Sequence, residues 1–295
     1  MSPVAHAGST LEQLPLARTV LDNGLVFHYA EQGEGVPLVF LHGVLGDWRT
    51  WAPQWPAFTP HFRCISYSRR YSVPNDNQLA SPDHSALEEA RDLEALLARW
   101  QAVPAILVGA SYGAYAALAL AQRRPDLVRA LALVEPPLLW LADSTDEGRR
   151  VRSDFDQRNR LPARAAFEHG DEARAVWLLT EGILGGNDLS AQLPQAMARR
   201  AENVESLRRV TLSSDEFPAL DMAALSALAV SVPVLLLSGE HTPPIHDVVF
   251  QALCKALPRA EFRKLAGAGH GVARDQSEAF NAVVLDFLAR RLRLR

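Results

Sequence analysis

The sequence contains one serine in a setting that would activate it as a nucleophile. The segment Gly109-Ala110-Ser111-Tyr112-Gly113 follows the apolar run Ala105–Val108 and precedes the small-residue stretch Ala114–Gln122. This order predicts a sharp strand-to-helix turn, in which the glycines leave room for a strained backbone that exposes the serine hydroxyl. The new helix would direct unpaired N–H groups and its positive dipole end to the same place. The alternative is that Ser111 only caps this helix.

A histidine near the carboxyl end of the chain has the properties of a general base. His270 lies in the glycine-rich segment 266–271, after the expected strand Glu261–Leu265, so its imidazole can swing toward a serine. Imidazole titrates close to neutral pH, which suits it to moving a proton. The other histidines fit this role less well. His241 and His246 could be metal ligands, but cysteine and carboxylate partners at suitable spacing are missing, so the sequence predicts no metal site.

A loop after an earlier strand could stabilise negative charge on a reacting carbonyl oxygen. His42-Gly43-Val44 follows the expected strand Pro37–Leu41, and Gly43 lets the main chain come close to a substrate. The backbone N–H groups of Val44 and Tyr112 are the natural pair of donors for an oxyanion. We expect His42 to hold this loop through hydrogen bonds rather than to act as a base.

Together these motifs resemble those of the α/β-hydrolase superfamily. The resemblance rests on His42-Gly43, Gly109–Gly113 and Gly269-His270, in that order, with a helical insertion after the sixth strand, and it covers residues 18–292. It implies an eight-stranded, mostly parallel sheet and a Ser-His-acid triad. It does not identify a substrate, because the superfamily includes esterases, lactonases, carbon-carbon bond hydrolases, dehalogenases and non-hydrolytic members.

The acid of the implied triad is missing from its usual place. Most of the superfamily has a pattern resembling Gly-x-x-Asp after the seventh strand, whereas this sequence has Gly239-Glu240-His241-Thr242, and threonine cannot be the acid. Glu135 directly follows the strand before the insertion, where haloalkane dehalogenases and a fungal-toxin lactonase are known for an acid. We therefore favour Glu135 as the residue that orients His270. Glu240 and Asp247 are the alternative acids, and Glu135 could instead cap the insertion.

A serine nucleophile selects among the reactions of this fold. Haloalkane dehalogenases and epoxide hydrolases need a carboxylate nucleophile, so Ser111 argues against both activities. The leading prediction is a serine hydrolase that cleaves a carboxylic ester or a lactone through an acyl-enzyme intermediate, with no metal or organic cofactor. The alternatives are a carbon-carbon bond hydrolase acting on a keto acid and a receptor-like member of the fold that binds a ligand.

Arginines and apolar side chains indicate how a small-molecule substrate would be held. Arg69 and Arg70 follow the expected strand Cys64–Tyr67 and could bind a substrate carboxylate, although we expect at least one of them to pair with a carboxylate of the protein instead. The remaining walls should be mostly apolar, unless the same side chains only pack the insertion onto the core. The other predicted pocket residues are Gly43, Trp48, Tyr112, Leu139, Trp140, Trp177, Ile183 and Val272.

Short apolar runs would form the elements that position these residues. Runs without alternation are typical of strands covered on both faces, and segments with helical periodicity lie between them. This order predicts a parallel sheet sandwiched by helices, opened by an antiparallel hairpin that turns at Asn23-Gly24. The runs are Leu38–Leu41, Cys64–Tyr67, Ala105–Val108, Leu131–Val134 and Val234–Leu237.

One long helical segment, residues 138–232, interrupts the alternation. We expect two of its helices at Ala163–Leu184 and Leu189–Val210, with a turn at Gly185-Gly186-Asn187. Such an insertion should fold over the carboxyl ends of the strands as a lid, because sites form there, although a separate helical domain is the alternative. The predicted hydrolase core is residues 1–137 and 233–295.

The composition is that of an ordinary globular protein. The chain has 295 residues, of which 48% are hydrophobic and 22% charged, and its formal net charge of -4 provides no basic excess for nucleic acid or anionic lipid. Cys64 and Cys254 lie too far apart to build a disulfide framework. Met1–Leu16 lacks the features of a signal peptide, and no apolar run could span a membrane. We expect a cytoplasmic monomer or homodimer that binds neither nucleic acid nor membrane.

Overall fold

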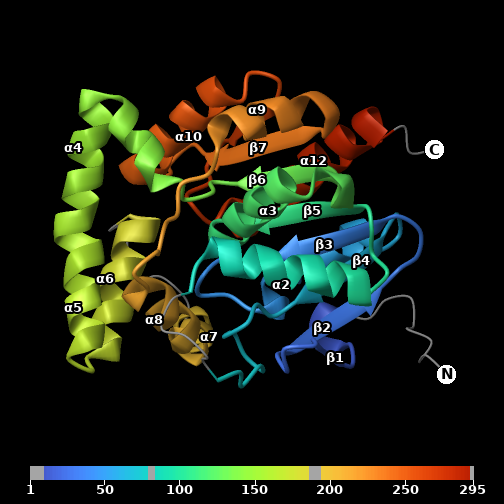
Figure 1. The fold of residues 1–295 in the computed structure, drawn as a ribbon, viewed down its shortest axis with the longest axis horizontal. Coiled ribbons are helices and arrows are strands. Elements are labelled where there is room, and N and C mark those ends of the chain that lie inside the picture. Colours follow the sequence, from blue (N-terminus) through green and yellow to red (C-terminus); the bar gives the residue numbers. More distant parts are fainter. Residues whose placement is uncertain (1–9, 79–83, 186–193, 293–295) are drawn as a thin grey trace.

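The computed structural model describes residues 10–78, 84–185 and 194–292, in which an eight-stranded sheet is covered by helices on both faces (Figure 1). Across the sheet the strands lie in the order β1, β2, β4, β3, β5, β6, β7, β8. All neighbouring strands from β4 to β8 in this order run parallel to each other. β2 is antiparallel to both of its neighbours, β1 and β4. The predicted α/β class and mostly parallel sheet are therefore confirmed. The strands are β1 Ala17–Val20, β2 Val26–Gln32, β3 Pro37–Leu41, β4 Arg63–Tyr67, β5 Ala105–Ala110, β6 Val128–Val134, β7 Val234–Gly239 and β8 Glu261–Leu265.

The opening hairpin forms where the sequence predicts it. β1 pairs with β2 from Val20 opposite Val26, and the turn between them includes Gly24 at a φ of +83°. A positive φ is easy for glycine because it has no Cβ, so Gly24 lets the chain reverse here.

Both faces of the central strands are buried, which explains their uninterrupted apolar runs. In β3, Leu38 and Phe40 pack in one core cluster, whereas Val39 and Leu41 pack in the other, because successive side chains of a strand point to opposite faces. The first cluster lies against α1 Trp55–Phe58 and α12 Ser277–Leu292. The helices on the second face are α2 Ala86–Arg99, α3 Tyr112–Arg123, α9 Met222–Ser231 and α10 Pro244–Ala256.

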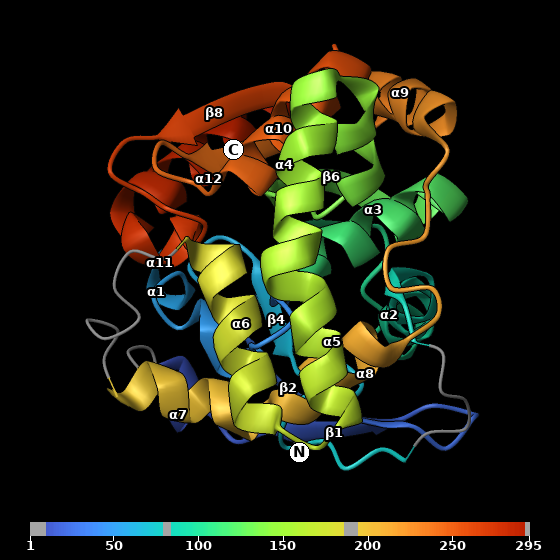
Figure 2. The same ribbon diagram turned by 90° about the vertical axis from the view of Figure 1, so that its left-hand side faces the viewer.

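Most helices of the segment between β6 and β7 stand at one end of the sheet, on the left in Figure 1 and toward the viewer in Figure 2. We call residues 138–232 the helical insertion. Its helices are α4 Asp146–Phe155, α5 Leu161–Glu168, α6 Glu172–Leu184, α7 Pro194–Glu202, α8 Val204–Leu212 and α9, and shorter turns occur at Leu139–Ser144, Asp156–Arg160 and, before the insertion, Pro125–Leu127. Other short elements are Leu11–Gln13, Trp48–Trp51 and α11 Val272–Asp275.

The two long helices predicted in the insertion are each broken in the structure. The first is interrupted between α5 and α6 at Gly170, whose φ of +78° lies outside the helical region. The described part of the second is divided between α7 and α8 at Asn203, whose φ of -103° and ψ of 18° depart from the helical values. The side-chain amide of Asn203 donates to Asp47 at 2.8 Å. The start of the second predicted helix, and Gly186 and Asn187 of the predicted turn, lie outside the described residues.

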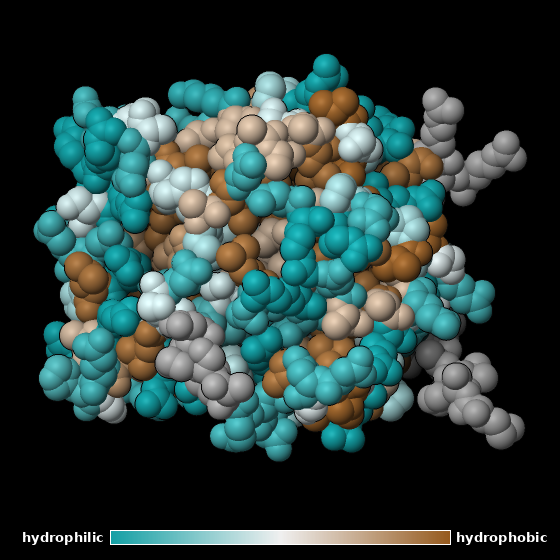
Figure 3. All heavy atoms as spheres, in the orientation of Figure 1, coloured by the Kyte–Doolittle hydropathy of each residue, from teal (hydrophilic) through white to brown (hydrophobic). Residues whose placement is uncertain are grey.

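The last helix of the insertion packs differently from the others. α9 contacts α3 and contributes Leu225 and Leu228 to the core of the sheet, so it is a covering helix of the core rather than part of the group at the strand ends. This differs from the predicted division of the chain, which placed it with the insertion. Apolar side chains gather at the surface over α9 in Figure 3. On this helix Val230 is 63% exposed. Within the described ranges, no helix has both the length and the apolar character to span a membrane.

Candidate active site

Ser111 occupies the strained turn between β5 and α3. Its φ of 51° and ψ of -120° are unusual for a residue with a side chain, as expected for a turn that projects the hydroxyl. The flanking glycines are required for close packing. A Cβ at Gly109 would lie 2.7 Å from the Cα of Ala114, and one at Gly113 would lie 2.5 Å from the carbonyl oxygens of Leu41 and His42.

His270 forms a short hydrogen bond with Glu135. Its Nδ1 lies 2.6 Å from Glu135 Oε2, and both side chains are almost completely removed from solvent. The carboxylate also accepts hydrogen bonds from Ser238 Oγ at 2.6 Å, from the Gly239 N–H at 3.0 Å and from Thr242 Oγ1 at 2.8 Å. Burial opposes the charge, but the His270 hydrogen bond and charge outweigh it and lower the pKa of Glu135 to about 2. Glu135 is therefore an ionised acceptor.

The two alternative acids have other partners. Glu240 is exposed and accepts a hydrogen bond from the Gly267 N–H at 2.9 Å. Asp247 pairs with Lys264 and accepts from Gln251 Nε2 at 2.7 Å. The carboxylate that the structure brings to His270 is that of Glu135, and Thr242, at the end of the usual acid motif, donates to it.

The loop after β3 is held by a buried polar network. His42 Nδ1 donates to the Gly43 carbonyl at 2.7 Å, and its Nε2 accepts from the Arg69 N–H at 3.0 Å. Burial and the nearby Arg69 lower the pKa of His42 to about 3, so the ring is neutral and can both donate and accept. The Arg69 guanidinium also donates to the Gly43 carbonyl and pairs with the buried Glu89. His42 thus holds the loop, in agreement with the expectation for it.

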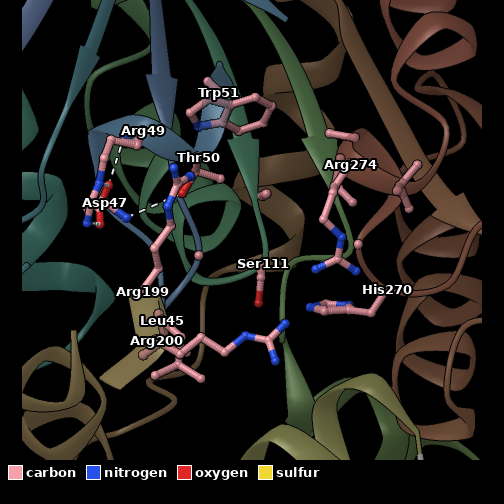
Figure 4. Close-up of a pocket in the computed structure, with 18 of the residues that line it drawn as sticks. Leu45, Asp47, Arg49, Thr50, Trp51, Ser111, Arg199, Arg200, His270 and Arg274 are labelled. Atoms are coloured by element: carbon pink, nitrogen blue, oxygen red, sulfur yellow. Dashed lines mark hydrogen bonds and ion pairs between the residues drawn. The ribbon is translucent and has the colours of Figure 1, made fainter. Parts of the chain in front are cut away.

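A pocket of about 510 Å³ opens beside Ser111 (Figure 4). Its walls come from the carboxyl ends of strands and from the helical insertion, which supplies Thr180, Ile183 and Arg200 among other residues. A second, smaller hollow of about 50 Å³ adjoins Ser111. Of the predicted residues, Gly43, Val44, Ser111, Ile183, His270 and Val272 line the larger pocket, and Tyr112 and Leu139 line the smaller one.

The two arginines predicted to bind a substrate carboxylate are held by the protein instead. Arg69 is 1% exposed and pairs with Glu89. Arg70 donates to both carboxylate oxygens of Asp92, at 2.7 and 2.6 Å. Both acids project from α2, so the interpretation as structural arginines applies to each of them, and neither arginine lines the pocket that the described residues form.

Three predicted tryptophans also lie off the described pocket walls. Trp48 is buried in the core cluster beside β3. The pocket is lined instead by Trp51, the last residue of the short helical turn that begins at Trp48. Trp140 packs on Tyr115 with ring centroids 5.9 Å apart. Trp177 is 49% exposed, because the helix α6 turns that side chain away from the core.

Comparison with known proteins identifies the family. A family described as the alpha/beta hydrolase fold matches residues 36–273, which is most of the chain and includes the sheet from β3 to β8. The chain belongs to the alpha/beta hydrolase fold family.

Relatives of this alpha/beta hydrolase carry several different names. BpoC of Mycobacterium tuberculosis, proposed to be a non-heme bromoperoxidase, is 25% identical and covers 88% of this chain and 97% of its own. RutD of Klebsiella pneumoniae, proposed to be a carbamate hydrolase, is 26% identical over 86% and 92% of the two chains. The crystal structure of the enol-lactonase from Burkholderia xenovorans LB400 superposes with a TM-score of 0.71 at 21% identity, covering 92% and 100% of the chains. These likenesses support a hydrolase without selecting its substrate.

The sequence interpretation missed two groups of residues in this alpha/beta hydrolase. Four arginines, Arg49, Arg199, Arg200 and Arg274, line the larger pocket, and His246 lines the smaller one. Nothing in the local pattern of Arg199 and Arg200 distinguishes them from solvated arginines of a helix. Arg274 follows His270 by four positions on the same loop and short helix, a proximity that could have drawn attention to it.

His246 stacks on His270. The ring centroids lie 3.9 Å apart at an interplanar angle of 15°, and His246 Nε2 donates to the Ile183 carbonyl of the insertion at 3.1 Å. Burial and the neighbouring His270 lower the pKa of His246 to about 3, so this ring is neutral. His246 therefore connects the insertion to the face of His270.

Glu135, His246 and His270 have possible metal-ligand atoms within 4.8 Å of one another. Their hydrogen bonds argue against a shared ion. Nδ1 of His270 and Nε2 of His246 already hold the carboxylate and the Ile183 carbonyl, and the lone pairs of two stacked rings point along parallel planes rather than toward one point. We interpret the three residues as a hydrogen-bonded and stacked group.

Acid should destabilise the folded protein partly through His246. Its ordinary pKa of 6.5 falls to about 3 on folding, so the unfolded chain binds the proton more readily and stability is lost as pH falls from 6.5 toward 3. His246→Phe keeps a stacking ring but removes this titration. We expect its free energy of unfolding in urea to decline less steeply between pH 7 and 5, by up to ~1.4 kcal/mol per pH unit. His241→Phe, at an exposed position, should follow the wild-type slope. Equal slopes for all three proteins would contradict this prediction.

Proposed function

We propose that this protein is a serine hydrolase that cleaves a carboxylic ester or a lactone through an acyl-enzyme intermediate. The observation that carries the proposal is the 2.6 Å hydrogen bond from His270 to the buried carboxylate of Glu135, beside a serine in a strained strand-to-helix turn. A carboxylate on one ring nitrogen leaves the other to accept a proton, which is the arrangement that activates a serine. Figure 4 shows Ser111 and His270 directed toward the same pocket.

In this mechanism His270 takes the proton of Ser111 as the hydroxyl oxygen attacks the substrate carbonyl carbon. The backbone N–H groups of Val44 and Tyr112 donate to the resulting oxyanion, and the loop lies against the serine, because a Cβ at Gly43 would be in van der Waals contact with that of Ser111, at 3.4 Å. His270 then returns the proton to the leaving alcohol. Water, activated by the same imidazole, hydrolyses the acyl-enzyme. Glu135 orients the ring and stabilises its charged form.

We further propose that α4 to α8 of the helical insertion act as a lid. Thr180, Ile183 and Arg200 line the pocket together with residues at the strand ends, so a substrate would be enclosed between the insertion and the sheet. A lid in this place would select the substrate and exclude bulk water.

The test is reaction with a fluorophosphonate probe, with mass spectrometry of the labelled peptide, followed by turnover assays on a panel of aryl esters and lactones. A single adduct on Ser111 that disappears in His270→Ala, together with multiple turnover of at least one member of the panel, is the expected result. A folded protein that gives no adduct would contradict the proposal and favour a ligand-binding, receptor-like role. Turnover of a vinylogous keto acid without action on esters would favour the carbon-carbon bond hydrolase.

A further inference from the structure

The peptide group between Gly43 and Val44 is held by three donors on its carbonyl side. The Gly43 carbonyl oxygen accepts hydrogen bonds from His42 Nδ1 at 2.7 Å and from the Gly46 N–H at 3.1 Å. Arg69 Nη2 is the third donor, also at 3.1 Å. Because His42 and Arg69 are buried, the carbonyl is directed into the interior of the protein.

The direction of this carbonyl sets the direction of the Val44 N–H. The C=O and N–H groups of a planar trans peptide point to opposite sides, so a carbonyl fixed toward the interior turns the N–H outward. The loop lies against Ser111 on its other side, and Val44 lines both the larger pocket and the smaller hollow together with that serine. The donors to the Gly43 carbonyl therefore direct the Val44 N–H toward the reacting atoms.

Arg69 also contacts the residue that carries the second oxyanion donor. Its guanidinium carbon lies over the ring of Tyr112, 5.4 Å from the ring centroid. Such a contact between a cation and an aromatic face is attractive, and more so where water is excluded. One side chain thus touches both of the segments, after β3 and after β5, that supply the proposed oxyanion donors.

Glu89 of α2 holds the guanidinium in this place. Arg69 Nη1 donates to Glu89 Oε1, and the two side chains are 1% and 3% exposed. His84 Nε2 lies 2.9 Å from the same carboxylate oxygen. Burial opposes the charge of Glu89, but Arg69 and His84 outweigh it and lower the pKa of this carboxyl to about 2. An ionised acid therefore anchors Nη1 and leaves Nη2 to donate to Gly43.

We propose that Arg69, anchored by Glu89, is a positioning residue of the reaction. Through the Gly43 carbonyl it holds the Val44 N–H where that group can donate to the oxyanion. This inference rests on the proposed serine hydrolase activity for its effect on rate, but not for its effect on the loop. It gives Arg69 a part in the reaction without the contact to a substrate carboxylate that the sequence suggested.

Replacing both members of the ion pair tests this role without leaving one buried charge alone. In Arg69→Met/Glu89→Gln, the glutamine can place its carbonyl oxygen at the position of Oε1 and its NH₂ group at that of Oε2, which has no hydrogen-bond partner among the described residues. Removal of an oxyanion donor lowers kcat by roughly 100- to 1,000-fold, so we expect a misdirected donor to lower it by about 10- to 50-fold. KM should stay within about threefold, because the donors act mainly on the transition state.

An ester and its thionoester show whether the loss lies in the oxyanion donors. Sulfur is a weaker hydrogen-bond acceptor than the carbonyl oxygen it replaces, so the wild type should favour the ester after correction for the spontaneous rates. We expect Arg69→Met/Glu89→Gln to lower the ester-to-thionoester ratio of kcat/KM by at least about fivefold. A general loss of folding would lower both rates alike, and an unchanged ratio would overturn the proposal.

Arg70→Met/Asp92→Asn is the matched control. Arg70 is adjacent to Arg69 and pairs with Asp92 of the same helix, but its guanidinium lies over the ring of Tyr71. The ratio should stay within about twofold of the wild type, as for a change away from the site, and equal losses in the two double variants would overturn the proposal. If Arg69→Met/Glu89→Gln fails to fold, Arg69→Lys replaces it. Lysine keeps the charge but not the planar fork, so the ratio should fall by about two- to fivefold.

Hydrogen exchange separates this inference from the proposed hydrolase activity. The Gly46 N–H donates to the Gly43 carbonyl, so exchange in residues 42–48 reports on that carbonyl without a substrate. We expect faster exchange there in Arg69→Met/Glu89→Gln and wild-type exchange in the Arg70 control. Unchanged exchange with an unchanged ester-to-thionoester ratio would overturn the role of Arg69 and leave the hydrolase standing. Faster exchange in a protein whose wild type turns over no ester would support the hold on the loop and contradict the hydrolase alone.

Discussion

Ser111→Ala is expected to lose multiple turnover of the ester or lactone substrate, with kcat lower by about 10⁵- to 10⁶-fold. Alanine keeps the Cβ that the strained turn already accommodates at a φ of 51°, so the substitution removes the hydroxyl without adding backbone strain. The residual rate would come from substrate binding and the oxyanion donors alone. Steady-state kinetics with an active-site titration of the wild type measures this loss.

The exposed Ser144 of the insertion provides a matched serine-to-alanine control, which should keep wild-type kinetics. Near-equal melting temperatures for Ser111→Ala and the wild type would show that the fold is intact. Activity within tenfold of the wild type in a folded Ser111→Ala protein would remove this serine from the mechanism.

Glu135→Gln is expected to lower kcat by about 10⁴-fold with little change in KM. The amide has nearly the same shape but no charge, so it cannot stabilise a protonated His270. If its NH₂ group faces the ring, it also cannot accept the 2.6 Å hydrogen bond from His270 Nδ1. Oε1 accepts from Ser238 and Gly239, and Oε2 accepts from Thr242 and His270, so an amide nitrogen in either place would face two donors. Kinetics across pH 5 to 9 measures the effect.

The matched controls are the two other candidate acids. Glu240→Gln and Asp247→Asn should keep kcat within about threefold, because their carboxylates contact Gly267 and Lys264 rather than His270. A large loss in either control, with Glu135→Gln active, would reverse the assignment.

Glu135 also contributes stability that is present above its ordinary pKa of 4.5 and is lost as pH falls toward about 2, so Glu135→Gln should show a weaker pH dependence of unfolding in that range.

Local sequence was enough to predict the elements around the candidate nucleophile. The apolar run that becomes β5, the glycines at 109 and 113 and the small residues of α3 are contiguous, so steric requirements within one segment dictate the turn at Ser111. The insertion was harder to predict, because the two predicted helices are interrupted at Gly170 and Asn203, where the backbone angles of one residue depart from an otherwise helical pattern.

The local sequence did not show which arginines line the pocket. Arg69 and Arg70 directly follow a strand, as binding residues often do, yet Glu89 and Asp92 of α2 neutralise them. Arg200, in contrast, belongs to an ordinary helical pattern and reaches the pocket only because α7 lies at the end of the sheet. Whether an arginine lines the pocket depends on how the fold packs the element that carries it, which the local sequence does not show.

The sequence by itself determined the α/β class, a mostly parallel sheet opened by a hairpin, and the candidacy of Ser111, His270 and Glu135, because each depends on short-range pattern or on position at a strand end. Only the tertiary structure decided that Glu135, rather than Glu240 or Asp247, meets His270, that His246 stacks on that ring, and that Arg200 and Arg274 line the pocket. These contacts join residues far apart in the chain, and their geometry follows from how helices pack on the sheet rather than from any local periodicity.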